Sequence, residues 1–433
     1  MNLRRRTRII AVFLCLAAYL ASAFPVSAED ELTLASEAAV LMDADTGTVL
    51  YQKNMHEVLY PASITKIMTA YLAVQELRSD QVLTVSSTAV NAVSRTSSHI
   101  SLTAGEQLTA EQALYALGME SANDAANVLA EAVAGSLEAF AEQMTAAARS
   151  LGAENTNFAN ANGLPNSEHY TTAYDMALIT AAAWKVEELA KYFSTVNYTL
   201  PATNMSDARI FQNKDRLLEG GQYYYEGVQM AKTGWTTAAQ GTFAAVVTQG
   251  DVTLVVVTMK SPQLEDKYKD THKLLDYGFS HYSAVTVTGE TVTSGLELGK
   301  YSAVSGQKLL YLIPSEYTAE DITFSIDLPD YTDPRRTSIT AAVYASIGEL
   351  RLPDKEIKLQ RPAEERKDFT ISQLLQGEAQ SVQDVVQALR IPGIVLLALC
   401  AAALPFWLHH MHVRHRRRRR LKAKIRRMKK KME

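Results

Sequence analysis

The sequence predicts a chain of mixed α/β (α+β) class, followed by a small all-β domain and a C-terminal transmembrane helix. Residues 36 to about 280 combine helical and strand patterns, whereas short alternating strands dominate from about Ser283 onward. Residues 391–408 form an uncharged apolar stretch of 18 residues, about the minimum length that spans a bilayer. Together these observations predict two exported domains and one membrane anchor.

A secretory signal peptide is predicted at residues 1–28. Four arginines lie before residue 9, and an apolar run extends from there to about residue 23. Small residues then occupy the positions that a signal peptidase reads, so we expect cleavage after Ala28. A retained signal anchor is the less favoured alternative. The larger exported domain then covers residues 29–282.

The β-rich domain is predicted at residues 283–362. Turn residues such as Pro329-Asp330 and Pro353-Asp354 separate its strands. The predicted strands are residues 284–288, 308–313, 321–328, 338–347 and 356–360. A polar, partly helical stalk at 363–390 leads to the apolar span.

The segment after the span, residues 409–433, carries 13 Lys or Arg and one acid, Glu433. Because basic flanks remain in the cytoplasm, this tail is expected inside the cell membrane and both domains outside it. The only cysteines, Cys15 and Cys400, lie in the two apolar segments. The exported part is therefore expected to fold without a disulfide.

The net charge of −4 conceals a strong asymmetry along the chain. Without the four N-terminal arginines, the 13 tail cations and Glu433, 26 basic and 46 acidic residues remain. The exported region thus carries about −20, which argues against nucleic-acid binding there.

The pattern Ser-x-x-Lys occurs twice. Ser305 lies in the β-rich domain, before a glycine and a strand, so nothing fixes it relative to Lys308. Ser63 instead opens a helical pattern, in which Lys66 lies one turn on and within reach of the hydroxyl. Ser63 as an ordinary helix cap is the alternative reading of this copy.

Two further motifs favour chemistry at the first copy. Ser121-Ala122-Asn123 begins a second amphipathic helical pattern, and Lys232-Thr233-Gly234 ends a short apolar strand. Two buried-looking strands, joined around Gly250, follow that tripeptide. The ordered set of three motifs is far more specific than any one of them.

With these motifs the chain resembles the low-molecular-mass penicillin-binding proteins, the serine-type D-alanyl-D-alanine carboxypeptidases. The resemblance implies a penicillin-recognising fold of the β-lactamase and transpeptidase type, with a sheet flanked by helices, a helical subdomain and a β-rich domain behind. The matching stretches are AAVLMDADTGTVLYQKN, PASITKIMTA, ESANDAANVLA, NANGLPNSEHYTTAYDMA and AKTGWTT.

Acyl transfer needs a nucleophile, a base and donors for the oxyanion. Ser63 is the expected nucleophile, and Lys66 is its base, with a pKa lowered by burial and by Lys232. Ser121 is expected to relay the proton to the leaving amine, while Asn123 binds the substrate backbone.

The remaining site residues are expected to hold the C-terminal end of the substrate. Lys232 and Thr233 suit the terminal carboxylate, and the missing side chain of Gly234 lets the substrate lie against the strand. The resemblance implies that the backbone N–H groups of Ser63 and Trp235 form the oxyanion hole.

The predicted function is removal of the terminal D-alanine from peptidoglycan stem pentapeptides, with covalent binding of β-lactams such as penicillins. No cofactor is expected. His99, His169 and His272 have no metal-ligand spacing and are expected to be surface or core residues. A β-lactamase is the first alternative, although Glu168 lies outside the Glu-x-x-Leu-Asn pattern of such enzymes. A penicillin sensor or scaffold is the second, and the short tail argues against it.

One departure from the family pattern concerns the rim of the predicted cleft. The family usually places an Ala-Gly pair after Lys-Thr-Gly, whereas this chain has Ala238-Ala239-Gln240-Gly241.

Overall fold

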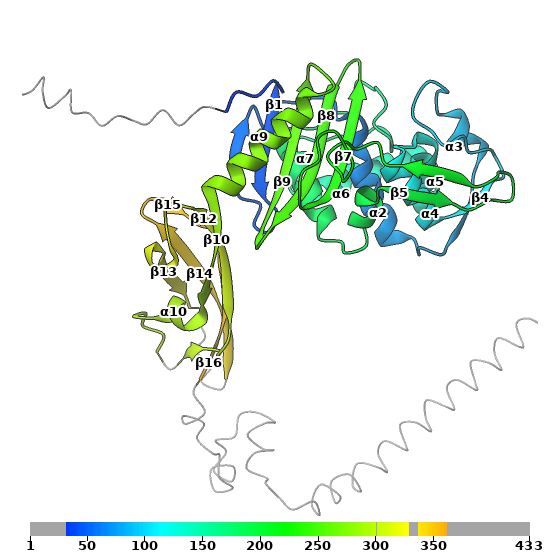
Figure 1. Ribbon diagram of the computed structural model, residues 1–433. Helices are drawn as coiled ribbons and strands as arrows, with labels where there is room; N and C mark the ends of the chain where they lie inside the picture. Colours follow the sequence, from blue (N-terminus) through cyan, green and yellow to red (C-terminus); the bar gives the residue numbers. More distant parts are fainter. Residues whose placement is uncertain (1–31, 300, 329–336, 362–433) are drawn as a thin grey trace, which may run out of the picture. The chain divides into compact units, whose positions relative to one another are not determined.

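The computed structural model describes residues 32–299, 301–328 and 337–361, which form two compact units (Figure 1). Of the described residues, the first unit comprises 32–287, 308–323 and 345–353. The second comprises 288–299, 301–307, 324–328, 337–344 and 354–361. The predicted signal peptide, stalk, membrane span and basic tail lie outside the described residues.

A five-stranded antiparallel sheet of order β2-β1-β9-β8-β7 forms the centre of the first unit. Its strands are β1 (Ala38–Asp43), β2 (Val49–Lys53), β7 (Val228–Thr236), β8 (Gln240–Gln249) and β9 (Val252–Ser261). The predicted pair of buried strands is confirmed as β8 and β9. Gly250 turns the chain between them at a φ of 56°, a conformation that glycine adopts without strain.

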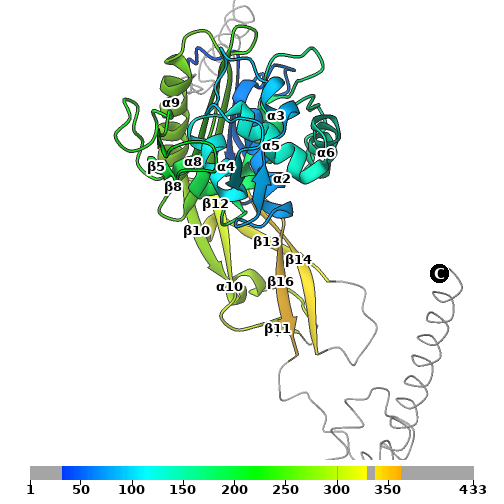
Figure 2. The same ribbon diagram turned by 90° about the vertical axis from the view of Figure 1, so that its right-hand side faces the viewer.

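Both faces of this sheet are covered, which explains why its strands are apolar without interruption. Val255 and Val257 of β9 join one hydrophobic core, whereas Leu254 and Val256 join the other. Successive side chains of a strand point to opposite faces, so burial on both sides requires a continuous apolar run. Figures 1 and 2 show α9 (Asp266–His281) on one face and the remaining helices of this unit on the other.

The helical side supplies the elements that carry the first two motifs. The helices are α2 (Lys66–Glu76), α3 (Ser87–Asn91), α4 (Ala110–Met119), α5 (Asn123–Ala134), α6 (Leu137–Ser150), α7 (Ala173–Trp184) and α8 (Ala190–Ser194). Two small hairpins, β3 (Val82–Thr84) with β4 (Gln107–Thr109) and β5 (Asn197–Leu200) with β6 (Arg209–Gln212), complete it. The mixed α/β class predicted from the sequence is confirmed.

The five strands predicted after residue 282 are also confirmed. β10 (Tyr282–Thr288) pairs with β12 (Lys308–Pro314) in a two-stranded sheet. A second sheet has the order β11-β16-β14-β13, with β15 paired to β14. Its strands are β11 (Ser302–Ala303), β13 (Thr323–Asp327), β14 (Ser338–Ile347), β15 (Leu350–Arg351) and β16 (Lys355–Gln360). The short helix α10 (Gly289–Thr293) was not predicted.

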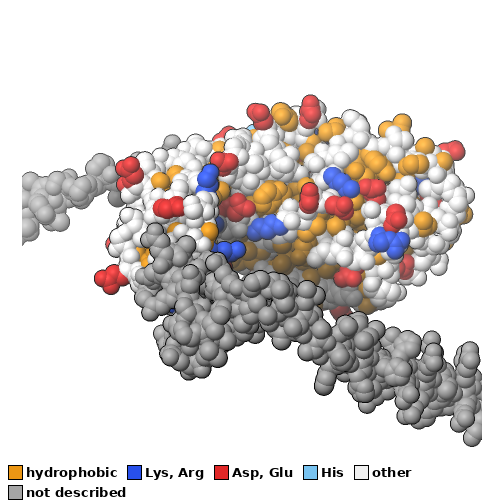
Figure 3. All heavy atoms as spheres, turned by 90° about the horizontal axis from the view of Figure 1, so that it is seen from below, with side chains coloured by type: hydrophobic (Ala, Val, Ile, Leu, Met, Phe, Trp, Pro, Cys, Tyr) orange, Lys and Arg blue, Asp and Glu red, His pale blue; other side chains and the backbone are white. Residues whose placement is uncertain are grey.

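Alternate residues of β14 are buried, including Ile339, Ala341 and Val343, so this sheet covers its core on one face only. Over residues 32–299, 301–328 and 337–361, no helix combines the length and apolar character that a membrane crossing requires. On the face drawn in Figure 3, basic and acidic side chains lie interspersed rather than in one basic field.

Candidate active site

The first Ser-x-x-Lys motif lies where a short 3-10 helix, η1 (Ala62–Thr65), runs into α2. Residues three apart nearly eclipse one another in a 3-10 turn, which brings Lys66 beside Ser63. The Nζ of Lys66 donates a hydrogen bond of 3.0 Å to the Oγ of Ser63. Ser63 occupies the N-cap position of neither helix, so its interpretation as a helix cap is wrong.

Lys66 is fully buried, and two more acceptors hold its amine. Its Nζ donates to the Oδ1 of Asn123 at 2.7 Å and to the backbone oxygen of Asn162 at 2.6 Å. Burial lowers the pKa of Lys66 well below 10.5, and repulsion by Lys232 lowers it further, against the attraction of Asp124. A lysine in this setting can be neutral and accept a proton near physiological pH.

The Ser-x-Asn motif lies at the beginning of α5. Asn123 is the first residue of that helix and is buried against the Lys66 amine. Ser121 is also buried and has a φ of 56°, a left-handed conformation that is rare for serine. Within the described part of the chain, no hydrogen bond joins Ser121 to Ser63 or Lys66. The assignment of Ser121 as proton relay stays a prediction.

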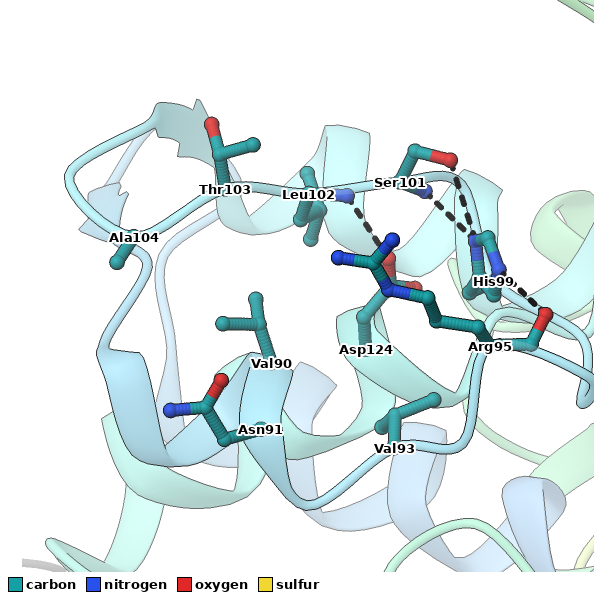
Figure 4. Close-up of a pocket in the computed structure, with 10 residues that line it drawn as sticks. All are labelled: Val90, Asn91, Val93, Arg95, His99, Ser101, Leu102, Thr103, Ala104 and Asp124. Atoms are coloured by element: carbon teal, nitrogen blue, oxygen red, sulfur yellow. Dashed lines mark hydrogen bonds between the residues drawn. The ribbon is translucent and has the colours of Figure 1, made fainter.

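The next residue, Asp124, organises a loop beside this motif (Figure 4). Its carboxylate accepts the backbone N–H groups of Ile100 at 3.2 Å and of Leu102 at 3.0 Å. The backbone N–H of Asn123 donates to the oxygen of Ser98 in the same loop. A cavity of about 880 Å³ lies between this loop and α3, with Asp124 in its wall. The loop is therefore fixed to the residues that surround Lys66.

The Lys-Thr-Gly motif lies in β7, one of the two edge strands of the central sheet. Lys232 is buried, and its Nζ donates to the backbone oxygen of Thr233 at 2.8 Å. Trp235 is 43% exposed and lies at the same edge strand. An edge strand leaves backbone groups unpaired, so an extended peptide can bind alongside it.

Gly234 is the point where β7 meets the nucleophile. A Cβ added there would lie 2.3 Å from the Oγ1 of Thr242 and 2.8 Å from the backbone nitrogen of Ser63. The space is thus filled by this protein's own atoms, and glycine is required for the close approach of η1 to the strand. This reason differs from the predicted one, which was contact with the substrate.

Two residues that the sequence analysis missed complete the surroundings of Lys232. Lys267 of α9 is buried and donates to the Oγ1 of Thr233 and, at 3.1 Å, to the oxygen of Gly234. Burial lowers its pKa to about 8, against the attraction of Asp215. Asp215 is buried too, and its Oδ2 has no hydrogen-bond partner among the described residues.

These three charged groups influence one another's protonation. Burial raises the pKa of Asp215, while Lys232 and Lys267 oppose that rise. Burial also lowers the pKa of Lys232, against the attraction of Asp215 and together with repulsion by Lys267. Because the cluster holds two lysines and only one carboxylate, its excess of positive charge favours the binding of an anion. No local pattern marks Lys267 or Asp215, because both reach the site only through tertiary packing.

His169 is buried next to η1. The backbone N–H of Ser101 donates to the ring of His99, and the ring of His272 bonds the backbone oxygen of Tyr223. No three His, Cys, Asp or Glu side chains gather into a potential metal site in the segments that the structure describes.

Comparison with known proteins agrees with this geometry. Residues 25–263, more than half of the chain, match the family model for D-alanyl-D-alanine carboxypeptidases. The chain belongs to this family. The resemblance predicted from the sequence is confirmed.

Several members of the D-alanyl-D-alanine carboxypeptidase family are similar to the chain. DacF of Bacillus subtilis is 35% identical over 258 residues, which cover 58% of this chain and 64% of the relative. DacC of Escherichia coli is 33% identical over 260 residues, covering 58% and 63%. The chain thus spans a little under two thirds of the length of these relatives. The crystal structure of penicillin binding protein 6B from Escherichia coli shares the fold, with a TM-score of 0.60, 23% identity and coverage of 75% and 95%.

The departure from the family pattern after Lys-Thr-Gly has a structural counterpart. Gln240, at the beginning of β8, has a φ of 55°, a left-handed conformation that glycine would adopt without strain. Glu168, the one glutamate of the stretch NANGLPNSEHYTTAYDMA, is exposed to solvent.

Proposed function

We propose that this protein is a serine-type D-alanyl-D-alanine carboxypeptidase that acts on peptidoglycan stem pentapeptides and is acylated by penicillins. One observation carries the proposal: the Nζ of a fully buried Lys66 lies 3.0 Å from the Oγ of Ser63. The lowered pKa of Lys66 supports its role as the base that takes the serine proton.

In the proposed reaction the Oγ of Ser63 attacks the carbonyl carbon of the penultimate residue and its proton passes to Lys66. The peptide bond breaks, the terminal D-alanine leaves with a proton that Ser121 relays, and an ester on Ser63 remains. Water then hydrolyses this ester. Asn123 would bind the backbone of the substrate, since its Oδ1 faces Lys66 and its amide group remains available as a donor.

The C-terminal carboxylate of the substrate would lie beside Lys232, Thr233 and Lys267. Support comes from the two buried cations and from the hydroxyl of Thr233, which already binds one of them. The backbone N–H groups of Ser63 and Trp235 are proposed as the oxyanion donors. The close approach of Ser63 to Gly234 is consistent with that pairing.

The topology is proposed from the sequence. A signal peptide at 1–28 would export a catalytic domain at 29–282 and a β-rich domain at 283–362. A stalk at 363–390, a span at 391–408 and a basic cytoplasmic tail at 409–433 would anchor the chain in the cell membrane. Protease added to cells without a wall should then digest the catalytic domain and spare a tag fused after Glu433.

The activity is tested by incubating purified residues 29–385 with a diacyl-Lys-D-Ala-D-Ala peptide and measuring free D-alanine. We expect release by the unaltered chain and none by Ser63→Ala. A chain that binds fluorescent penicillin on Ser63 and releases no D-alanine would contradict the carboxypeptidase activity.

A chase separates this activity from that of a β-lactamase. The exposed position of Glu168 argues against a glutamate base for water, so the penicilloyl adduct should persist for minutes after excess unlabelled drug is added. Loss of label within seconds, slowed by Glu168→Gln, would favour the β-lactamase.

A further inference from the structure

His169 lies in the loop that joins α6 to α7 and is buried, with 1% of its surface exposed. Its ring lies 5.6 Å from that of Phe158, centroid to centroid. Its Nε2 lies 2.8 Å from the Oγ1 of Thr65, a residue between Ser63 and Lys66 in the motif. A histidine that the sequence gives no reason to place near the nucleophile therefore contacts the nucleophile turn.

The hydrogen bonds around this ring fix its protonation. The backbone N–H of Ala159 donates to Nδ1 at 3.0 Å, so Nδ1 carries no proton. The proton of the neutral ring is therefore on Nε2, which lies 2.8 Å from the Oγ1 of Thr65 and donates to it. Thr65 in turn donates its own proton to the backbone oxygen of Ala62 at 2.7 Å.

This chain of bonds ends on the peptide unit that contains the backbone nitrogen of Ser63. Ala62 has a φ of 49°, a left-handed conformation that costs an alanine roughly 1–2 kcal/mol. A peptide unit is planar, with its C=O and N–H pointing in opposite directions. A bond that holds the oxygen of Ala62 therefore also sets the direction of the Ser63 N–H, one of the proposed oxyanion donors.

Two glycines confine the same peptide unit from either end. A Cβ on Gly163 would lie 1.9 Å from the oxygen of Ala62, and one on Gly234 would lie 2.8 Å from the nitrogen of Ser63. The peptide unit is held closely on both sides. Small rotations of it would meet backbone atoms of the neighbouring loop or strand.

We propose that His169 is a positioning residue, which in its neutral form holds the Ala62–Ser63 peptide unit through Thr65 and so aims the Ser63 N–H at the reacting carbonyl. The inference rests on the proposed function. Burial lowers the pKa of His169 to about 4, which agrees with a neutral ring in the working enzyme. His169 itself touches neither Ser63 nor substrate in this role.

The test removes the hydrogen bond between His169 and Thr65 by changing each partner in turn, in the full-length chain. His169→Phe keeps a ring and removes both nitrogens, and Thr65→Val keeps the shape and removes the hydroxyl. Each should slow acylation by fluorescent penicillin on the order of 10- to 100-fold, since it loosens the position of the reacting groups. For the peptide substrate kcat should fall while KM changes little, because the affected donor acts on the transition state.

Three comparisons decide the outcome. Thr65→Ser, which restores the hydroxyl, should recover most of the rate. The double variant His169→Phe/Thr65→Val should be no slower than the slower single variant, since both remove one shared bond. His272→Phe, which breaks a histidine bond to the oxygen of Tyr223 on the other side of the sheet, should acylate at the normal rate.

Normal rates in both single variants, or losses that multiply in the double variant, would overturn the inference. If His169→Phe does not fold, Thr65→Val against Thr65→Ser gives the same decision from the other end of the bond. Failure of the proposed function looks different, because the unaltered chain would then release no D-alanine.

Discussion

The chain contains the pattern Ser-x-x-Lys twice, and the two copies have different structures. In the first, a 3-10 turn and a helix bring the Nζ of Lys66 to 3.0 Å from the Oγ of Ser63. In the second, Ser305 and Gly306 form a turn and Lys308 begins strand β12, with Ser305 and Lys308 both exposed. The same residue types thus produce a nucleophile candidate in one place and a surface turn in the other.

The difference lies in what surrounds the lysine. Lys66 is held by Asn123 and Asn162, which are 57 and 96 residues away in the sequence. The packing that brings these residues together also buries the amine, and burial, with repulsion by Lys232, lowers its pKa. Lys308 stays in solvent. Spacing along the chain therefore selects candidates, and long-range packing decides which of them can perform chemistry.

The largest expected effect is on the two serines. Ser63→Ala should abolish covalent labelling by fluorescent penicillin, because the Oγ of Ser63 is the hydroxyl that lies beside the Lys66 amine. Ser305→Ala should label at the normal rate, since that serine has no base beside it. Gel fluorescence after a short pulse of fluorescent penicillin measures the labelling of both variants. Labelling that survives Ser63→Ala would remove the distinction between the copies.

The two lysines should differ almost as much. Lys66→Arg replaces a base with a guanidinium that stays charged, so acylation should fall by about 10²- to 10⁴-fold. Lys308→Arg should have no effect. Stopped-flow labelling of each variant measures the rate, and near-normal acylation in Lys66→Arg would exclude a proton transfer to this residue.

The pH dependence sharpens this comparison. The base acts in its neutral form, and burial lowers the pKa of Lys66. The acylation rate of the unaltered chain should therefore rise with pH and reach its plateau well below pH 10.5, the ordinary pKa of lysine. A rate that still rises in proportion to hydroxide above that pH would contradict a lowered pKa.

Much of this arrangement could be predicted from the sequence, and the rest has a common physical reason for being missed. The β8–β9 hairpin and the strands after residue 282 follow from apolar patterns that are local in the chain. The pairing of Ser63 with Lys66 follows from helical spacing. In contrast, Lys267 comes from the helix on the far face of the sheet, and no local pattern marks a single lysine there.

His169 and Gly234 illustrate the same limit in another way. A lone histidine is more often a core or surface residue, and only the approach of its loop to Thr65 gives it a role. The sequence marks Gly234 as special, but the reason is the closeness of Ser63 and Thr242. Residue identity was predictable at this position, and the neighbouring atoms were not.

Two glycines provide a matched test of packing around the copies. Gly163 and Gly306 have nearly the same backbone angle, with φ of 82° and 81°. A Cβ on Gly163 would lie 1.9 Å from the oxygen of Ala62, whereas a Cβ on Gly306 would have nothing within 4 Å. Gly306→Ala should thus cost only the left-handed conformation, about 1–2 kcal/mol in free energy of unfolding.

Gly163→Ala should cost this amount and about 1–3 kcal/mol more for overpacking, and it should also slow acylation because Ala62 must move. Urea unfolding with penicillin labelling on the same samples measures both quantities. If both variants lost the same free energy of unfolding and Gly163→Ala were labelled at the normal rate, the close contact between Gly163 and the nucleophile turn would affect neither stability nor acylation.

The smallest expected effect concerns the carboxylate site, which the first copy has nearby and the second lacks. A charge-assisted hydrogen bond contributes about 1.5–3 kcal/mol, so amidating the C-terminus of the peptide substrate should lower kcat/KM about tenfold or more. Lys232→Ala and Lys267→Met should each shrink the ratio between the acid and the amide, because either cation can face the carboxylate. Lys308→Ala, which removes an exposed cation elsewhere, should leave the ratio unchanged.

D-alanine release from the acid and D-alaninamide release from the amide give the two rates on the same enzyme sample. Equal rates for acid and amide in the unaltered chain would leave the two buried lysines without a substrate charge to bind, and their burial would then need another explanation.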